Sequence, residues 1–146
     1  MTSAVTFLTN TASAEEIQVH LLGCELGFVH ALTQHTDIRL YAEKMAALAT
    51  RFELWQASQL VGLLAVYCNQ PPQAFITNVS LWPSLQKQGY AAQLMTPCIT
   101  HVQSLGIKSI MLKVANSNSK AIAFYQQFGF SSVAADASEQ TMQRAF

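Results

Sequence analysis

A glycine-containing turn ahead of a helix pattern is the first stretch of this sequence whose residues indicate chemistry. QKQGYA occupies residues 86–91, shortly after Pro83, and an apolar helix pattern follows it. The first turn of a helix carries unpaired backbone N–H groups and a partial positive charge, so it attracts anions. Gly89 permits close approach of the backbone to such an anion, and Lys87 adds a positive charge. Considered alone, the stretch fits a phosphate cradle or a simple turn into a helix.

A second stretch, VANSNSKAIAFYQQFGF at residues 114–130, places polar residues on a short helix pattern. Asn118 stands where a helix N-cap is expected, because its side chain can accept a hydrogen bond from the first helical turn. Tyr125 has two interpretations. It is an aromatic residue that packs a helix face on a sheet, or it is a phenol that donates a proton to a leaving group.

The elements that must position these residues follow from the apolar periodicity. We expect strands over residues 4–8, 51–56, 60–68, 74–82, 109–115, 129–135 and 139–146, and helices over residues 13–34, 38–50, 88–105 and 118–128. Ser13 and Glu16 form a capping box for the first helix, Gly106 ends the third, and the prolines in 69–73 predict a loop. This order predicts one α/β (α+β) domain over residues 1–146, with helices on both faces of a sheet.

The composition indicates a folded domain and excludes some classes of partner. The 146 residues carry eight Lys and Arg against eight Asp and Glu, and 51% are hydrophobic, as in a folded domain. The basic residues are scattered, so no nucleic-acid partner is expected. The apolar run at residues 60–67 is too short to span a membrane, and the N-terminus lacks the pattern of a signal peptide. The low charge is compatible with a homodimer.

The cysteines indicate the redox state of the compartment in which the protein is found. Cys24, Cys68 and Cys98 lie far apart among apolar neighbours. Their odd number and their spacing indicate buried free thiols in a reducing compartment rather than a disulfide or a metal site. The four histidines show no metal-ligand spacing with them. We therefore expect a cytoplasmic protein without a metal.

Both stretches resemble motifs of the GNAT superfamily of acyl-CoA-dependent N-acetyltransferases. QKQGYA is similar to that family's diphosphate motif, Gln/Arg-x-x-Gly-x-Gly/Ala, and residues 118–130 are similar to its Asn-x-x-Ala-x-x-x-Tyr-x-x-x-Gly-Phe helix. The resemblance is specific over about residues 51–131 and rests on element order before residue 50. It implies a mixed sheet of six or seven strands in which two strands splay apart.

The resemblance implies acetyl-CoA as the co-substrate. Leu81 would hold the pantetheine arm through its main chain, Asn118 would contact the cofactor, and Tyr125 would donate a proton to the leaving thiolate or hydrogen-bond its sulfur. A backbone N–H near residues 79–81 would polarise the thioester carbonyl. The diphosphate would face the backbone N–H groups of Gln86, Lys87, Gln88, Gly89, Tyr90, Ala91 and Ala92.

The general base is left open by the sequence. Many members of the family carry a Glu on the central strand, but residues 74–82 contain no carboxylate. Asn78 and Ser80 share one face of that strand and are candidates to bind substrate or position a water, although neither has the pKa of a base. Glu53, on the neighbouring strand, is a candidate base or a solvated strand residue. An amine that arrives neutral needs only a chain of waters.

The acceptor must be inferred from the first fifty residues and from residues 69–73. Glu25, His30 and Tyr41 are expected to line its pocket. The neutral composition favours the primary amine of a small molecule, such as an amino sugar or an amino acid. Two alternatives stay open: a non-catalytic protein that senses acyl-CoA or serves as an interaction module, and an acetyltransferase of protein N-termini.

Overall fold

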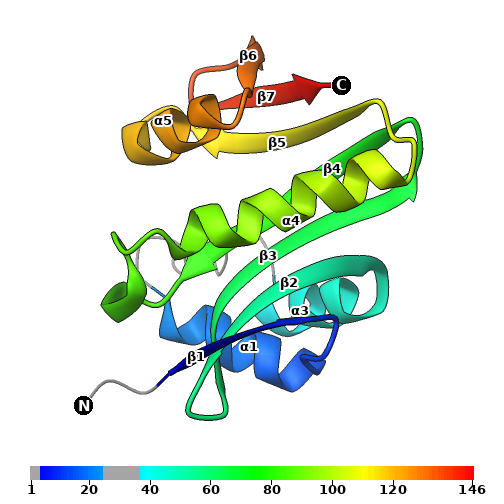
Figure 1. The fold of residues 1–146 in the computed structure, drawn as a ribbon. Coiled ribbons are helices and arrows are strands. Elements are labelled where there is room, and N and C mark those ends of the chain that lie inside the picture. The colour runs from blue at the N-terminus through cyan, green and yellow to red at the C-terminus, as the bar shows by residue number, and fades with distance from the viewer. Residues whose placement is uncertain (1–3, 25–36) are drawn as a thin grey trace.

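A seven-stranded sheet forms the centre of the computed structural model, which describes residues 4–24 and 37–146 (Figure 1). The strands are β1 (Val5–Thr9), β2 (Ala49–Gln56), β3 (Gln59–Gln70), β4 (Gln73–Leu81), β5 (Ser109–Ala115), β6 (Ser131–Ala135) and β7 (Glu139–Ala145). The helices in the described part are α1 (Ala14–Gly23), α3 (Ile38–Leu48), α4 (Tyr90–Ser104) and α5 (Ser119–Gln127), with a short 3-10 turn at Pro83–Leu85.

One parallel strand pair interrupts an otherwise antiparallel sheet. The strand order is β1-β2-β3-β4-β5-β7-β6, and β4 pairs in parallel with β5 across the α4 crossover. Their pairing covers only Gln73–Ile76 against Ser109–Leu112, although both strands continue further. Beyond that point the two strands part, as Figure 1 shows between β4 and β5. The predicted fold class, with its mixed sheet and splayed pair, is confirmed.

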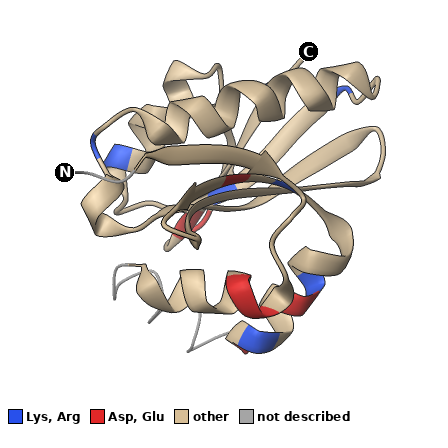
Figure 2. Ribbon diagram, turned by 60° about the horizontal axis from the view of Figure 1, so that its bottom comes forward, with Lys and Arg blue, Asp and Glu red and all other residues tan. Residues whose placement is uncertain are grey.

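Helices enclose the sheet on both faces, as predicted (Figures 1 and 2). α4 packs on one face through Leu94 and Val102, and half-buried residues of α5 extend this core. α1 and α3 cover the other face, where Ile17 is fully buried. Side chains alternate along a strand, so Leu63 of β3 faces the α1–α3 core while Leu64 faces the α4 core. This explains why the sequence of β3 is apolar without interruption.

A bulge in β4 changes which side chains face which core. Asn78 pairs with Ala65 and Ile76 pairs with Val66, so Thr77 has no partner on β3. Ile76 therefore packs in the core under α4, whereas Asn78, two residues later, lies on the face of α1 and α3. The bulge thus brings polar side chains of β4 to the face opposite α4.

Several boundaries differ from the sequence prediction. α1 ends at Gly23 instead of near residue 34, and residues 25–36 lie outside the described part of the chain. α3 ends at Leu48 because Ala49 and the residue after it pair with β3. The predicted loop at 69–73 is shorter, because Gln70 pairs with Gln73 and leaves only the two prolines in the turn.

Charged residues occupy few positions along the ribbon (Figure 2). On α3 the exposed Arg39 and Glu43 form an ion pair of 3.1 Å. On β2, by contrast, Arg51 and Glu53 are buried. None of the described helices combines the length and the apolar character needed to cross a membrane.

Candidate functional site

The turn before α4, residues 86–92, has the backbone form of an anion-binding site, and we call it the cradle. Gly89 is the N-cap of α4 with φ +83°, and Lys87 has φ +64°, so two residues within three positions are left-handed. The first hydrogen bond of the helix runs from Gln93 N–H to Gly89 O. The N–H groups of residues 89–92 therefore have no partner inside the helix. A Cβ added at Gly89 would meet no atom within 4 Å, so the space in front of the turn is open.

Side-chain and backbone bonds fix this turn to the end of β4. Gln86 Nε2 donates to Leu81 O at 3.2 Å, and Gln86 N–H donates to Pro83 O at 3.3 Å. Of the seven backbone donors expected to face a diphosphate, the N–H of Gln86 is thus already engaged. The structure thus holds Leu81 in contact with Gln86, the first residue of the predicted diphosphate motif.

The open edge of β4 lies beside this turn. Trp82 N–H donates to Val61 O of β3 at 2.9 Å. Consecutive residues of a strand direct their N–H and C=O groups to opposite edges. Leu81 and Val79 therefore direct theirs toward β5, which has already parted from β4. The main-chain groups of Val79 and the N–H of Leu81 are available there for a ligand with amides of its own, whereas Leu81 O already accepts from Gln86 Nε2.

α5 contributes the residues of the second motif. Asn118 is the N-cap predicted from the sequence, and its Oδ1 accepts from Ala121 N–H at 3.2 Å. The ring of Tyr125 lies edge-on to Phe124 and Phe130, with centroids 5.5 and 5.9 Å away. Burial raises the pKa of Tyr125 to about 12, so the phenol is protonated at neutral pH. The packing interpretation is therefore compatible with that of a proton donor.

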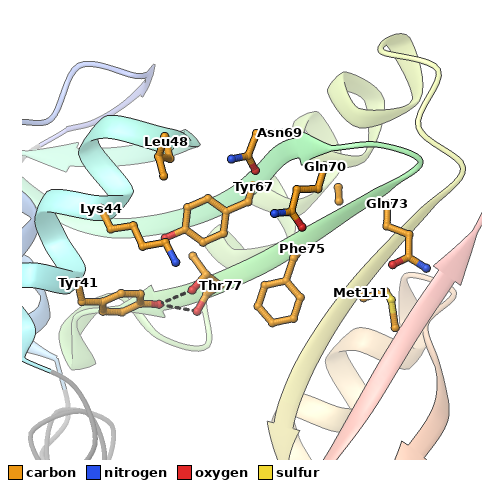
Figure 3. A pocket seen from close by; sticks show the side chains of 11 residues that line it. Tyr41, Lys44, Leu48, Tyr67, Asn69, Gln70, Gln73, Phe75, Thr77 and Met111 are labelled. Atoms are coloured by element: carbon orange, nitrogen blue, oxygen red, sulfur yellow. Dashed lines mark hydrogen bonds between the residues drawn. The ribbon is translucent and has the colours of Figure 1, made fainter.

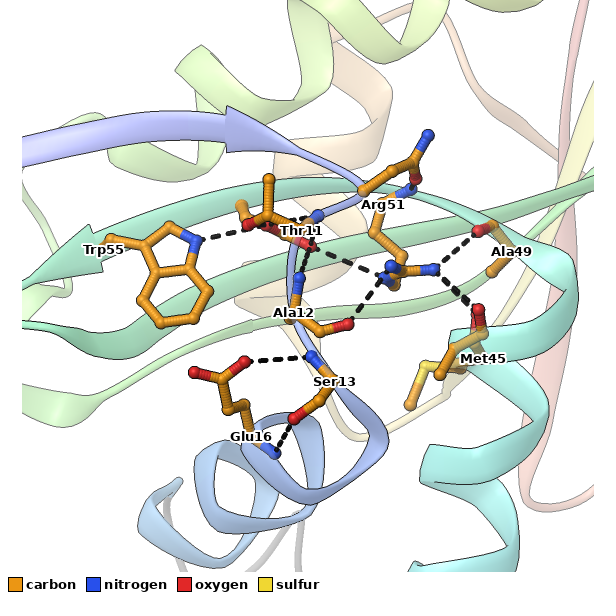
Figure 4. A network of polar contacts seen from close by, with 11 residues as sticks. Thr11, Ala12, Ser13, Glu16, Met45, Ala49, Arg51 and Trp55 are labelled. Atoms are coloured by element: carbon orange, nitrogen blue, oxygen red, sulfur yellow. Dashed lines mark hydrogen bonds and ion pairs between the residues drawn. The ribbon is translucent and has the colours of Figure 1, made fainter.

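Glu53 is fully buried, so the expectation of a solvated strand residue is wrong. Its carboxylate accepts from the backbone N–H groups of Thr11 and Ala12, from Thr11 Oγ1 at 2.6 Å, and from Trp55 Nε1 at 3.1 Å. Figure 4 labels these donor residues and Arg51. Arg51 Nε lies 3.5 Å from Glu53 Oε2, and the guanidinium also donates to Ala12 O. These contacts fix the segment between β1 and α1.

Asn78 and Ser80 meet a histidine that the sequence analysis did not assign to the site. His20 Nδ1 lies 3.0 Å from Leu60 O, and a carbonyl only accepts, so Nδ1 carries the proton. Nε2 then accepts from Ser80 Oγ at 2.8 Å, while Asn78 Nδ2 donates to the same Oγ at 2.8 Å. Burial lowers the pKa of His20 to about 4. Two polar residues that share a buried face of β4 need hydrogen-bond partners, but that signal in the sequence does not say which residue supplies them.

A cavity of about 530 Å³ lies between α3 and the sheet, on the face opposite α4 (Figure 3). Tyr41, which the sequence analysis assigned to an acceptor pocket, is one of its walls, and its hydroxyl donates to Thr77 O at 2.6 Å. Glu25 and His30 fall outside the described residues. Asn78 and Ser80 do not line this cavity. Its walls are Tyr41, Lys44, Leu48, Tyr67, Asn69, Gln70, Gln73, Ala74, Phe75, Thr77 and Met111.

Known proteins share both the sequence pattern and the fold. The chain is 29% identical over 79 residues to the uncharacterised N-acetyltransferase YvbK of Bacillus subtilis, which is 54% of this chain and 51% of that protein. It is 36% identical over 61 residues, 42% of each chain, to the ribosomal protein bS18-alanine N-acetyltransferase of Haemophilus ducreyi. The chain thus spans about half the length, or less, of these curated relatives.

The structural likeness covers more of the chain. PaiA N-acetyltransferase from Thermoplasma acidophilum, solved in complex with coenzyme A, superposes with a TM-score of 0.74 over 97% of this chain and 99% of its own, at 14% identity. At that identity the likeness shows a common fold. Residues 18–130 match the family model of the acetyltransferase (GNAT) family, which is most of the sequence. This protein is therefore a member of the acetyltransferase (GNAT) family.

Proposed function

We propose that this protein transfers the acetyl group of acetyl-CoA to the primary amine of a small molecule. The observation that carries the proposal is the left-handed turn at Lys87 and Gly89, which presents the free N–H groups of α4 beside the parted strands β4 and β5. Membership of the acetyltransferase family supports the same reaction.

The donor side fits a diphosphate with an amide-containing arm. The N–H groups of residues 89–92 bind the diphosphate, and the positive end of α4 adds to the attraction. Lys87 is exposed next to them. The main chain of Val79 and Leu81 pairs with the amides of the pantetheine arm across the edge that β5 leaves open. Asn118 caps α5 and contacts the same ligand through its Nδ2.

Acetyl-CoA supplies a thioester, whose sulfur must leave as the amine attacks. Tyr125 holds its phenolic proton at neutral pH because burial raises its pKa to about 12. It therefore serves as a proton donor or hydrogen-bond donor to the sulfur, while an N–H of residues 79–81 polarises the carbonyl. On β4, Asn78 Oδ1 is buried without a hydrogen-bond partner among the described residues, and a substrate amine or a water can donate to it.

Glu53 lies on β2, which β3 separates from β4, so it is not on the strand next to β4. Its two oxygens already accept hydrogen bonds from four donor groups and face Arg51. We assign it a positioning role for α1, and water removes the proton of the attacking amine. If Glu53 were the base, it would have to give up contacts that hold the segment before α1 in place.

A second candidate is acetylation of a peptide N-terminus, because one relative acts on the alanine of ribosomal protein bS18. An amine panel distinguishes the two candidates by thiol release from acetyl-CoA. It contains amino acids, amino sugars, polyamines and a hexapeptide that begins with alanine. We expect turnover of a small amine above that of the peptide. Calorimetric binding of acetyl-CoA without turnover of any amine would instead favour a sensor.

A further inference from the structure

The cavity under α3 reaches the sheet where β4 and β5 begin to part. Phe75 and Thr77 come from β4 and Met111 comes from β5, and the last paired residues of these strands are Ile76 and Leu112. The cavity lies on the opposite face from α4, whose N-terminus holds the cradle. A thioester placed between the parting strands is thus open to an acceptor from this side. Its volume of about 530 Å³ is that of a small-molecule site.

The described walls of this cavity carry one charge. Among the described lining residues, Lys44 is the single cation and none is a carboxylate. Lys44 Nζ lies over the ring of Tyr67, 5.2 Å from its centroid, and Figure 3 shows it directed into the cavity. The neighbouring Glu43 is paired with Arg39 instead. Among the described residues, no ion pair neutralises Lys44, so its charge is available to a ligand.

Polar donors and an apolar wall surround this charge. Asn69, Gln70 and Gln73 supply side-chain amides. Burial raises the pKa of Tyr67, so its hydroxyl also stays protonated. Phe75 and Met111 form an apolar wall on the far side of the cavity from Lys44 (Figure 3). The arrangement combines one cation, neutral donors and a surface for an apolar side chain.

We propose that this cavity binds the acceptor amine as a free amino acid with an apolar side chain, whose carboxylate pairs with Lys44. The inference rests on the proposed acetyl transfer and names the substrate class of that site. One lysine matches one carboxylate, whereas a phosphate ester would bring a second negative charge. A polyamine would meet the like charge of Lys44, and no carboxylate is among the described lining residues. A peptide N-terminus has no carboxylate next to its amine.

Matched pairs of acceptors test the proposal. L-Phenylalanine and L-methionine are compared with their C-terminal amides, which keep the side chain and the amine but lose the negative charge. The variants are Lys44→Met and, as a control on the same helix, Arg39→Met. Arg39 is exposed and does not line the cavity. The acid-to-amide ratio of kcat/KM cancels the intrinsic reactivity of each amine when wild type and variant are compared.

We expect the acid-to-amide ratio to fall about tenfold in Lys44→Met, since a charge-assisted hydrogen bond is lost. It should change by less than about twofold in Arg39→Met. The fall should appear in KM rather than kcat, because Lys44 binds and does not touch the reacting atoms. An unchanged ratio in Lys44→Met, or turnover of the amides and not the acids, overturns the assignment while leaving acetyl transfer intact.

Direct binding separates this inference from the proposed reaction. Saturation-transfer NMR with L-phenylalanine, recorded without acetyl-CoA, should show binding to wild type and Arg39→Met and a loss in Lys44→Met. Phenylalaninamide should bind weakly to all three. Equal binding of acid and amide to wild type overturns the carboxylate assignment. Failure of acetyl-CoA to bind in calorimetry overturns the proposed function, whatever the NMR result.

Discussion

His20 Nε2 lies 2.8 Å from Ser80 Oγ, and this hydrogen bond joins α1 to β4 across 60 positions of sequence. Both side chains are buried, and Asn78 Nδ2 donates to the same oxygen. The imidazole is neutral in the folded protein, because burial lowers its pKa from 6.5 to about 4. The link between the first helix and the strand beside the cradle therefore depends on an uncharged histidine.

A pH dependence of stability follows. Between pH 6.5 and 4 the unfolded chain protonates His20 and the folded chain does not, so the unfolded state binds more protons. The contribution is fully present above pH 6.5 and is lost as the pH falls toward 4, by about 3 kcal/mol in total. Urea unfolding at pH 7, 5.5 and 4.5 measures it. His20→Gln should remove this part of the slope, and an equal slope in the variant contradicts the prediction.

Tyr125→Phe should lower kcat about 100-fold while leaving the affinity for acetyl-CoA and the melting temperature nearly unchanged. The phenyl ring keeps the edge contacts with Phe124 and Phe130, so only the hydroxyl is lost. Thiol release measures kcat, and calorimetry measures acetyl-CoA binding. With a pKa of about 12, Tyr125 should also impose no loss of activity up to about pH 10. A variant with wild-type kcat would leave Tyr125 as a packing residue.

Gly89→Glu should abolish measurable acetyl-CoA binding, because it adds a negative charge at the proposed diphosphate site. Gly106 supplies a matched control at the other end of α4. Its φ is +76°, and a Cβ there also meets no atom within 4 Å. Both substitutions force a non-glycine residue into the left-handed region, at a cost of about 1–2 kcal/mol. Gly106→Glu should therefore lose similar stability but bind acetyl-CoA normally, and equal loss of binding in both variants argues against the cradle.

Glu53→Gln should lower the free energy of unfolding by about 3 kcal/mol, since it leaves the buried guanidinium of Arg51 without its counter-ion. Chemical denaturation measures the loss. The pH profile of kcat/KM for the folded fraction then separates positioning from base chemistry. We expect kcat/KM to fall at the same acidic pH in the variant as in wild type. Loss of this fall in the variant would identify Glu53 as the base.

Local signals in the sequence predicted much of the backbone. The capping box of Ser13 and Glu16, the cap at Asn118 and the left-handed ends of α4 all depend on neighbours within a few positions. Such contacts are visible in a sequence because the same short segment carries both partners. The cradle residues came together for the same reason: they belong to one turn after one strand.

The rest of the site depends on contacts between distant segments. Most donors to Glu53 belong to a distant segment, because Thr11 and Ala12 precede it by 42 and 41 positions in the sequence. His20 and Lys44 have ordinary positions in helix patterns, so only the packed fold shows that one is a buried acceptor and the other faces a cavity. The prolines at 71 and 72 predicted a broad loop, yet they occupy a tight turn between β3 and β4. The hydrogen bonds that pair these strands require no backbone N–H from either proline.

The unpaired Thr77 gives β4 one residue more than its ladder with β3 requires. Removal of Thr77 would make Ile76 and Asn78 consecutive, and consecutive residues of a strand point to opposite faces, so both would keep their present partners, Val66 and Ala65. A deletion at Val79 meets no such spare residue, so Ser80 would turn toward the core under α4 and Leu81 toward the face of α1. β4 should therefore tolerate the loss of one residue at the bulge but not between Asn78 and Trp82.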